Sequence, residues 1–226
     1  MNQIIETNIT IGLRRNLIEE IKQLFELKKY QNYGRVLEAM REVPRHFFAP
    51  VGFDKMAYEN QPMYIDEKQT ISTPNTVAIQ TYLLDIKPTD RILEIGTGSG
   101  YQASILGFLA AEVYSLERFK VLHDKAGDVI RKLGMTNIKM YLKDGFEGLE
   151  SEAPFDKIII TCAAPEIPKN LISQLKVGGI IVLPKDDGEG EQDMLRLVKN
   201  EDGSLEEEIF GKFKFVPMLT GINKKI

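Results

Sequence analysis

Short apolar runs alternate with longer amphipathic stretches along the chain from residue 90 onward. A short apolar run bounded by turn residues is typical of a buried strand, and apolar residues three or four apart are typical of a helix. This pattern predicts strands at residues 91–95, 112–116, 137–142, 156–161 and 178–184. It predicts helices between them at residues 101–111, 118–133 and 168–176. Strands and helices that alternate in this way predict an α/β fold in which helices cover both faces of a parallel sheet.

The N-terminal part of the chain carries a helical pattern instead. Apolar residues at helical spacing predict one helix around residues 13–25 and a shorter one around residues 36–43, which Pro44 ends. Residues 44–74 are rich in proline, aromatic and polar residues, show no clear period and predict a long ordered loop. Loops of that length in a compact domain are often functional. A third helix is expected at residues 76–85.

Two more strand-like stretches lie near the C-terminus, at residues 192–199 and 205–217. The turn residues Glu201-Asp-Gly-Ser204 between them predict a hairpin. No internal repeat and no low-complexity linker divides the sequence, so we expect a single domain over residues 1–226. Its expected parts are an N-terminal helical extension (1–88), an α/β core (89–184) and C-terminal strands (185–226).

The composition narrows the class of protein. A chain of 226 residues, 43% of them hydrophobic, can bury the core of one α/β domain with an appendage. No apolar run is long enough to cross a bilayer, and residues 1–7 lack the basic and apolar regions of a signal peptide. Cys162 is the only cysteine, which excludes an intrachain disulfide and favours a reducing cytoplasm. The net charge of −4 argues against a general nucleic-acid surface.

The most informative segment joins the first strand of the α/β core to its helix. The strand at residues 91–95 runs into Gly96, Gly98 and Gly100, and the helix begins directly after them. Such a turn places backbone N–H groups and the positive end of a helix dipole against a ligand, and glycines let that ligand approach the main chain. The dinucleotide pattern requires a third glycine where this chain has Tyr101, which argues against a dehydrogenase. A tight turn with nothing bound remains the alternative.

Two carboxylates stand near this turn. Glu94, two residues before the first glycine, suits a cationic amino group better than a pyrophosphate, which it would repel. Glu117 follows the next predicted strand, where a doubly wound nucleotide-binding fold places the carboxylate that accepts hydrogen bonds from ribose hydroxyls. Glu117 could instead be a solvated charge at a strand end. Together with the glycines, the two acids predict a nucleoside site.

The glycine turn and the two acids make the sequence resemble the S-adenosylmethionine-dependent methyltransferases. Within these enzymes, the sequence resembles the protein-L-isoaspartate O-methyltransferase family. The glycine motif carries only the wider resemblance, whereas Gln69-Thr-Ile-Ser-Thr-Pro74 and Phe215-Val-Pro217 are far more specific. The other matching motifs are Val43-Pro-Arg-His46, Ala57-Tyr-Glu59, Glu94-Ile-Gly-Thr-Gly-Ser-Gly-Tyr-Gln102, Asp144-Gly145, Ala153-Pro-Phe-Asp156 and Ala163-Ala164. The resemblance implies a Rossmann-like, doubly wound, mostly parallel seven-stranded sheet with an N-terminal helical extension and an antiparallel C-terminal strand pair.

The resemblance also implies an activity. The family transfers the methyl group of S-adenosyl-L-methionine to the free carboxylate of L-isoaspartyl residues, so damaged proteins and peptides are the expected partners, with no nucleic acid and no membrane. Ser72 matches the catalytic position, and Thr73 and Val216 match substrate-binding positions. The matching cofactor-binding positions are Glu94, Gly96, Thr97, Gly98, Ser99, Gly100, Glu117, Asp144 and Gly145.

Simpler interpretations of the same residues stay open. Ser72 or Thr73 could merely cap the helix that follows, and Asp144 could belong to an Asp-Gly turn. His46 and His123 are the only histidines and complete no evident Ser-His-Asp set, and no side chains have metal-ligand spacing, so no metal is expected. A methyltransferase for another carboxylate acceptor is the alternative function. A protein that keeps the nucleoside pocket without catalysis is a further one, which the presence of the Ser72 segment argues against.

Overall fold

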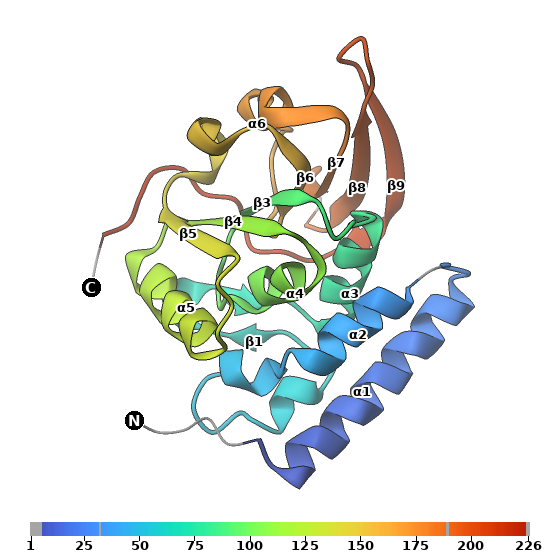
Figure 1. Ribbon diagram of the computed structural model, residues 1–226, viewed down its shortest axis with the longest axis vertical. Helices are drawn as coiled ribbons and strands as arrows, with labels where there is room; N and C mark the ends of the chain where they lie inside the picture. The colour runs from blue at the N-terminus through green and yellow to red at the C-terminus, as the bar shows by residue number, and fades with distance from the viewer. Residues whose placement is uncertain (1–5, 32, 189, 225–226) are drawn as a thin grey trace.

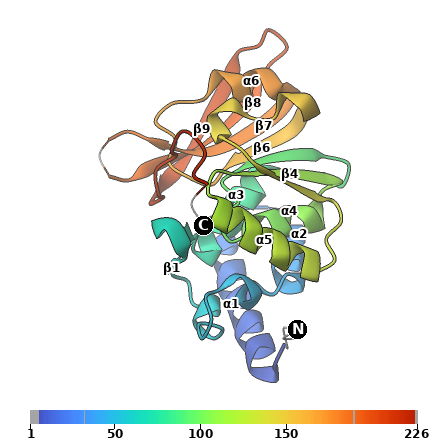
Figure 2. The same ribbon diagram turned by 90° about the vertical axis from the view of Figure 1, so that its left-hand side faces the viewer.

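The computed structural model describes residues 6–31, 33–188 and 190–224, which contain a seven-stranded sheet with helices on both faces (Figures 1 and 2). The strand order is β5-β4-β3-β6-β7-β8-β9. The strands are β3 (Arg91–Ile95), β4 (Glu112–Glu117), β5 (Ile138–Leu142), β6 (Phe155–Ile160), β7 (Leu175–Asp186), β8 (Gln192–Lys199) and β9 (Leu205–Phe213). The first five run parallel, and β8 and β9 continue the sheet antiparallel. The predicted fold class, including the antiparallel C-terminal pair, is confirmed.

The two faces of the sheet bury separate cores. Successive strand residues point to opposite faces, so Ile92 packs with the N-terminal helices while Leu93 packs under α6 (Lys169–Gln174). Both side chains are fully buried. The helices on the first face are α3 (Pro74–Leu83), α4 (Tyr101–Leu109) and α5 (Lys120–Lys132), with α1 (Asn8–Leu27) and α2 (Gly34–Glu42) packed outside them (Figures 1 and 2). The N-terminal extension therefore contributes to the same core as the sheet.

Residues 44–74 are more regular than the sequence pattern indicated. Two short strands, β1 (Met63–Tyr64) and β2 (Thr70–Ile71), pair antiparallel inside this segment. The segment also contains three 3₁₀ turns, at Arg45–Phe48, Met56–Tyr58 and Asp66–Lys68. Elements of two to four residues are too short to produce a hydrophobic period, so the prediction of a long ordered loop was incomplete. This folding places Ser72 in the short connection between β2 and α3.

Several predicted boundaries were wrong by two or more residues, and two of them change the path of the chain. The helix predicted to reach residue 176 ends at Gln174, because Leu175 already has an extended backbone and begins β7. The strand predicted at 205–217 ends at Phe213. Residues 214–217 leave β9, and this departure lets the chain return to the end of β6, where Ala163 and Pro217 form an isolated parallel bridge.

Among the described residues, no helix is both long and apolar enough to span a membrane. Residues 1–5, part of the N-terminal segment that lacks the features of a signal peptide, lie outside the described residues.

Candidate active site

A cavity lies at the carboxyl ends of β3, β4 and β6, where the strand order of the sheet reverses. It contains about 580 Å³ of empty space, part of it open to solvent, and is lined by Gly96, Gly98, Glu117, Gly145 and Val216 together with other residues of the strand ends. A smaller neighbouring cavity, with about 360 Å³ of empty space that is also partly open to solvent, is lined by Ser72, Thr97 and Ser99. The two cavities share the lining residues Thr70, Gly96, Gly98 and Thr161. Ligands of open α/β sheets bind at this kind of crevice, so the position agrees with the predicted nucleoside site.

The three glycines of the turn are required for different reasons. Gly96 has a φ of +93°, and a Cβ there would lie 2.6 Å from Thr161 Oγ1. Gly100 has a φ of +88°, and its Cβ would lie 3.1 Å from the Cβ of Ala126 on α5. Gly98, by contrast, would place a Cβ in nearly open space. Gly96 and Gly100 thus allow the backbone to pack, whereas Gly98 leaves the main chain accessible from the cavity.

Glu117 links the end of β4 to the glycine turn. Its Oε2 accepts a hydrogen bond from the Gly98 amide at 2.8 Å, and its Oε1 accepts one from the Phe119 amide at 2.9 Å. Burial raises the pKa of this carboxyl, although the backbone N–H donors oppose the shift. Each carboxylate oxygen can accept a second bond. The contact between Glu117 and a ribose stays a prediction, which its place on the cavity wall supports.

Glu94 lies beneath the turn and lines neither cavity. Its carboxyl is completely buried and accepts a hydrogen bond from the hydroxyl of Ser115, which in turn is 2.5 Å from the hydroxyl of Thr97. Burial raises the pKa of Glu94 to about 8, and its Oε1 has no hydrogen-bond partner among the described residues. The structure thus places Glu94 as a support for the turn. Its predicted contact with a cationic amino group is left untested.

Asp144 joins the end of β5 to the C-terminal segment. Its Oδ1 accepts from the Phe146 amide at 2.9 Å and its Oδ2 from the Gly221 amide at 2.5 Å, so Asp144 caps a 3₁₀ turn and lies outside both cavity walls. Gly145 lines the larger cavity, and a Cβ there would lie 2.3 Å from Ile95 Cγ2. Only glycine therefore fits at position 145. The predicted contact of Asp144 with the cofactor stays a prediction.

The structure distinguishes Ser72 from Thr73. Thr73 is the N-cap of α3: its Oγ1 accepts from the Thr76 amide at 3.2 Å and is hydrogen-bonded to the Thr76 hydroxyl at 2.9 Å. Ser72 lines the smaller cavity, and no described residue hydrogen-bonds to its hydroxyl. The helix-cap interpretation therefore applies to Thr73 and not to Ser72. A substrate contact of Thr73 stays a prediction, and its hydroxyl already has a structural function.

Val216 lies beside the end of β6. Its carbonyl accepts from the Ala163 amide at 2.8 Å, and the Met218 amide donates to the Ala163 carbonyl at 2.8 Å. These two bonds fix the Phe215-Val-Pro217 segment at the wall of the larger cavity. The Val216 amide has no acceptor among the described residues, which leaves it available to a bound molecule.

Sequence reasoning missed two residues of this site. Thr161 lines both cavities and donates a 2.6 Å hydrogen bond to the Gly96 carbonyl, which holds the glycine turn against β6. Arg45 donates to the Ser72 carbonyl at 2.7 Å. Arg45 belongs to the matching motif Val43-Pro-Arg-His46, but the resemblance assigned it no role.

Several other polar groups contribute to packing. The His46 ring is hydrogen-bonded through Nδ1 to the Tyr58 hydroxyl at 2.6 Å, and burial lowers the pKa of His46. Burial raises the pKa of the Cys162 thiol to about 12, which disfavours a thiolate nucleophile. Within the described residues, no group of three or more His, Cys, Asp or Glu side chains could hold a metal ion.

Comparison with known proteins agrees with this geometry. A sequence model of the protein-L-isoaspartate(D-aspartate) O-methyltransferase family matches residues 15–223. The chain is 43% identical over 212 residues to a protein-L-isoaspartate O-methyltransferase of Flavobacterium psychrophilum, covering 94% of this chain and 96% of that one. A solved protein-L-isoaspartate O-methyltransferase superposes with a TM-score of 0.79 at 25% identity, covering 90% of this chain and 65% of that chain. A Plasmodium falciparum structure in complex with S-adenosyl-L-homocysteine has the same fold, with a TM-score of 0.76 at 23% identity over 95% of this chain and 99% of that chain.

Proposed function

Because the chain belongs to the protein-L-isoaspartate O-methyltransferase family, we propose that it transfers the methyl group of S-adenosyl-L-methionine to the free carboxylate of L-isoaspartyl residues in damaged proteins and peptides. One observation carries this proposal beyond the family. The Ser72 hydroxyl and the Val216 amide line the two adjoining cavities around the glycine turn, and neither has a partner within the described residues. They can therefore hold an incoming carboxylate.

The residues around the glycine turn fit the cofactor. Gly98 leaves the main chain open to the cavity, Glu117 offers free acceptor positions, and Gly145 provides room where a Cβ would collide with Ile95. We propose that the turn from Gly96 to Gly100 and Glu117 hold S-adenosyl-L-methionine. When bound, this cofactor supplies an electrophilic methyl group on a positively charged sulfur.

The chain's own residues need to position the acceptor and exclude water. The free group of an isoaspartyl residue is its α-carboxylate, whose pKa of about 3.5 leaves it ionised at neutral pH, so no general base is required. The neutral Ser72 hydroxyl and Val216 amide can orient the carboxylate without the strong ground-state pairing of an arginine clamp. Ser72 and Val216 would direct a carboxylate oxygen at the methyl group that the cofactor would supply. The reaction of an anionic carboxylate with a cationic methyl donor cancels opposite charges, so a site that excludes water would accelerate it.

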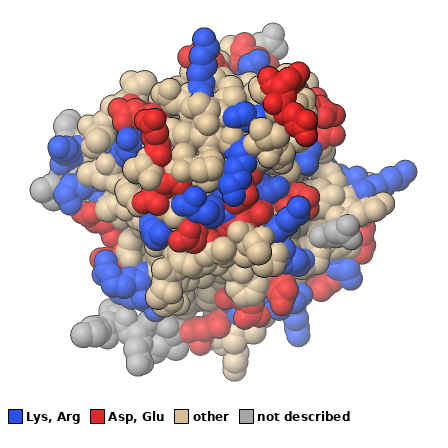
Figure 3. Space-filling view, turned by 45° about the horizontal axis from the view of Figure 1, so that its top comes forward, with Lys and Arg blue, Asp and Glu red and all other residues tan. Residues whose placement is uncertain are grey.

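The proposed setting is the cytoplasm, with polypeptide substrates and without nucleic-acid or membrane partners. A single cysteine leaves no intrachain disulfide to form, which is compatible with a reducing compartment. On the face drawn in Figure 3, acidic and basic side chains are interspersed, with no extended basic patch. We also propose that residues 1–226 form one domain, because the N-terminal helices and the sheet share a core.

The experiment that tests the function measures methyl transfer from labelled S-adenosyl-L-methionine to two peptides that differ only in one isoaspartyl or aspartyl linkage. The proposal predicts turnover on the isoaspartyl peptide alone. Equal labelling of both peptides, or labelling only of a small-molecule carboxylate, would favour the alternative of a methyltransferase for another acceptor. Base treatment of the product should release the label, because a carboxyl methyl ester hydrolyses readily whereas an N-methyl group does not.

A further inference from the structure

Arg45 is the largest completely buried side chain of the N-terminal extension, with an exposed fraction of 1%. Its Nε donates to the Ala57 carbonyl at 2.9 Å, and its Nη2 donates to the Ser72 carbonyl at 2.7 Å. Two planar donors of one guanidinium therefore connect the Met56–Tyr58 turn to the residue that carries the proposed catalytic hydroxyl.

The same guanidinium also contacts the cofactor side of the site. Its Cζ lies 4.8 Å from the centroid of the Tyr101 ring, over the face of that ring. Tyr101 is the first residue of α4, directly after the glycine turn. Tyr101 lines the smaller cavity together with Ser72. Burial raises the pKa of Tyr101 to about 12, so its ring remains a neutral phenol that can accept a cation–π contact. Arg45 thus connects the Ser72 segment to the start of the helix beside the proposed cofactor site.

The charge of Arg45 is not balanced by an acid. Its partners within the described structure are two carbonyls and an aromatic ring, and Nη1 has no hydrogen-bond partner. Burial lowers the pKa of Arg45 to about 10, which still leaves it protonated at neutral pH. A buried cation without a counterion is costly to the fold and favours a nearby anion. The anion that the proposed reaction brings to Ser72 is the substrate carboxylate.

We propose that Arg45 is a positioning residue for methyl transfer, which holds the Ser72 peptide unit in register with the start of α4 and favours a carboxylate at Ser72 through its unpaired charge. This inference rests on the proposed function. Arg45 lines neither cavity and acts through Ser72 and Tyr101. Arg45 should therefore affect how the acceptor is placed more strongly than how the cofactor is held.

The test compares Arg45→Met and Arg45→Lys with the control Arg35→Met. Arg35 likewise donates to two backbone carbonyls, those of Ile86 at 2.7 Å and Leu109 at 2.9 Å, but neither of these acceptor residues lines the two cavities. The measurements are kcat and KM for an isoaspartyl peptide, the Kd of S-adenosyl-L-homocysteine by calorimetry and the thermal unfolding midpoint.

Arg45→Met should lower kcat/KM for the peptide by about 10²-fold, the loss typical of a misplacement of about 1 Å, with a Kd for S-adenosyl-L-homocysteine within about threefold of wild type. Arg45→Lys keeps the charge and should recover about tenfold of that loss. Arg35→Met should keep the wild-type kcat/KM.

If Arg45→Met matches Arg35→Met in turnover, or loses cofactor affinity as strongly as turnover, the proposal is overturned. Should Arg45→Met fail to fold, a folded Arg45→Lys with wild-type kcat/KM overturns it equally. A wild-type protein inactive on the peptide would instead contradict the proposed function.

Discussion

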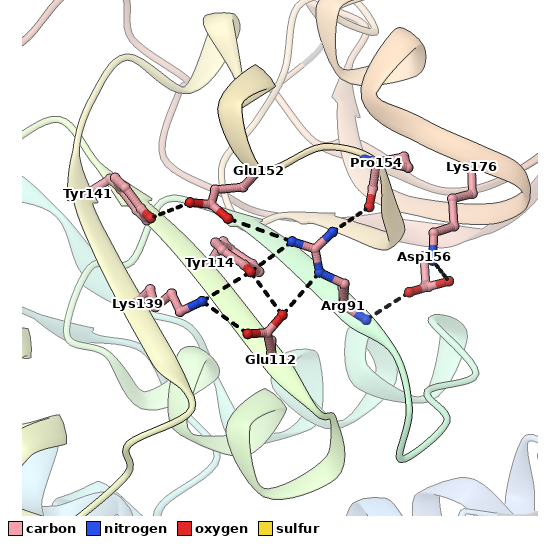
Figure 4. Close-up of polar contacts among 9 residues, drawn as sticks. All are labelled: Arg91, Glu112, Tyr114, Lys139, Tyr141, Glu152, Pro154, Asp156 and Lys176. Atoms are coloured by element: carbon pink, nitrogen blue, oxygen red, sulfur yellow. Dashed lines mark hydrogen bonds and ion pairs between the residues drawn. The ribbon is translucent and has the colours of Figure 1, made fainter.

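The amino ends and the carboxyl ends of the parallel strands form two opposite edges of the sheet, the amino edge and the carboxyl edge. These two edges differ in how their polar groups are paired. At the amino edge, the first residues of β3 and β4 and the second residue of β5 form a dense network (Figure 4). Arg91 donates to Glu112 at 3.1 Å and to the Tyr114 hydroxyl at 2.8 Å, while Lys139 donates to Glu112 at 3.0 Å. Arg91 also donates to the Pro154 carbonyl. Nearly every donor of this network has an acceptor.

At the carboxyl edge of the same strands, polar groups are left without partners. The Ser72 hydroxyl, the Val216 amide and one oxygen of Glu94 have none among the described residues. The first-turn amides of α3, in contrast, donate to the side chains of Thr73 and Asn60. Ser72 and Val216 are half-buried, so their polar groups are available to water or to a bound molecule, whereas the buried oxygen of Glu94 reduces stability. The comparison indicates that the amino edge stabilises the fold and that the carboxyl edge is organised to bind.

The largest effect is expected from Ser72→Ala. Removal of the hydroxyl should lower kcat on an isoaspartyl peptide by about 10²–10³-fold, as is typical for a donor that acts mainly in the transition state. The stability should change little, because Ser72 does not cap α3. Steady-state kinetics with a thermal unfolding control check this prediction. A Ser72→Ala variant with wild-type kcat would remove the catalytic role of the hydroxyl.

Glu117→Ala should weaken S-adenosyl-L-homocysteine by about 1.5–3 kcal/mol, the usual contribution of a hydrogen bond to a charged acceptor. The change also removes the acceptor of the Gly98 amide, so Glu117→Gln is the better matched variant and should lose less. Isothermal titration calorimetry measures both affinities. Unchanged Kd values in both variants would contradict the placement of the cofactor beside Glu117.

Thr73→Ala separates helix capping from catalysis. Loss of the cap should lower the free energy of unfolding by about 0.5–2 kcal/mol, because the Thr76 amide loses its acceptor. Turnover of the folded variant should stay within about threefold of wild type, well short of the loss expected at a group that acts in the transition state. Urea unfolding and kinetics on the same preparation provide the two readouts. A large fall in kcat without loss of stability would instead make Thr73 a substrate contact.

The smallest effect is expected at the amino edge from Glu112→Gln. Hydrogen bonds from Lys139, Tyr114 and Arg91 lower the pKa of Glu112 from 4.5 to about 2. A depressed carboxyl pKa stabilises the fold at pH values above the unfolded-state pKa, and this contribution disappears as the pH falls through the folded-state pKa. The side chain is 37% exposed, so Glu112→Gln should cost less than about 1 kcal/mol at pH 7.

Urea unfolding at pH 7 and at successively lower pH measures the difference in the free energy of unfolding between wild type and Glu112→Gln. This difference should narrow below pH 4.5. Glu207→Gln, at an exposed position of β9, is the matched control and should leave the profile unchanged. A difference between Glu112→Gln and wild type that stays constant down to pH 2 would show that the network does not stabilise the carboxylate.

The sequence predicted those features of the fold and the site that depend on residues close together along the chain. The strands, the glycine turn and the strand-end position of Glu117 follow from short apolar runs and from glycines at fixed spacing. The contact of Arg45 with Ser72 could not be predicted, because 27 residues separate them and a single buried arginine produces no pattern. Ser72 and Thr73 were equally compatible with a helix cap from composition alone, and only the three-dimensional position of each hydroxyl distinguishes them.

The most direct test of the division between the two edges measures kcat and the free energy of unfolding for Ser72→Ala and Arg91→Met in parallel. Arg91→Met removes hydrogen bonds to charged and polar acceptors at the amino edge and should destabilise the protein by about 1.5–3 kcal/mol with an unchanged kcat for the folded enzyme. Ser72→Ala should lose kcat and keep its stability. If Arg91→Met loses turnover at a temperature where it remains folded, or if Ser72→Ala loses stability in proportion to its activity, the assignment of stability to one edge and binding to the other is contradicted.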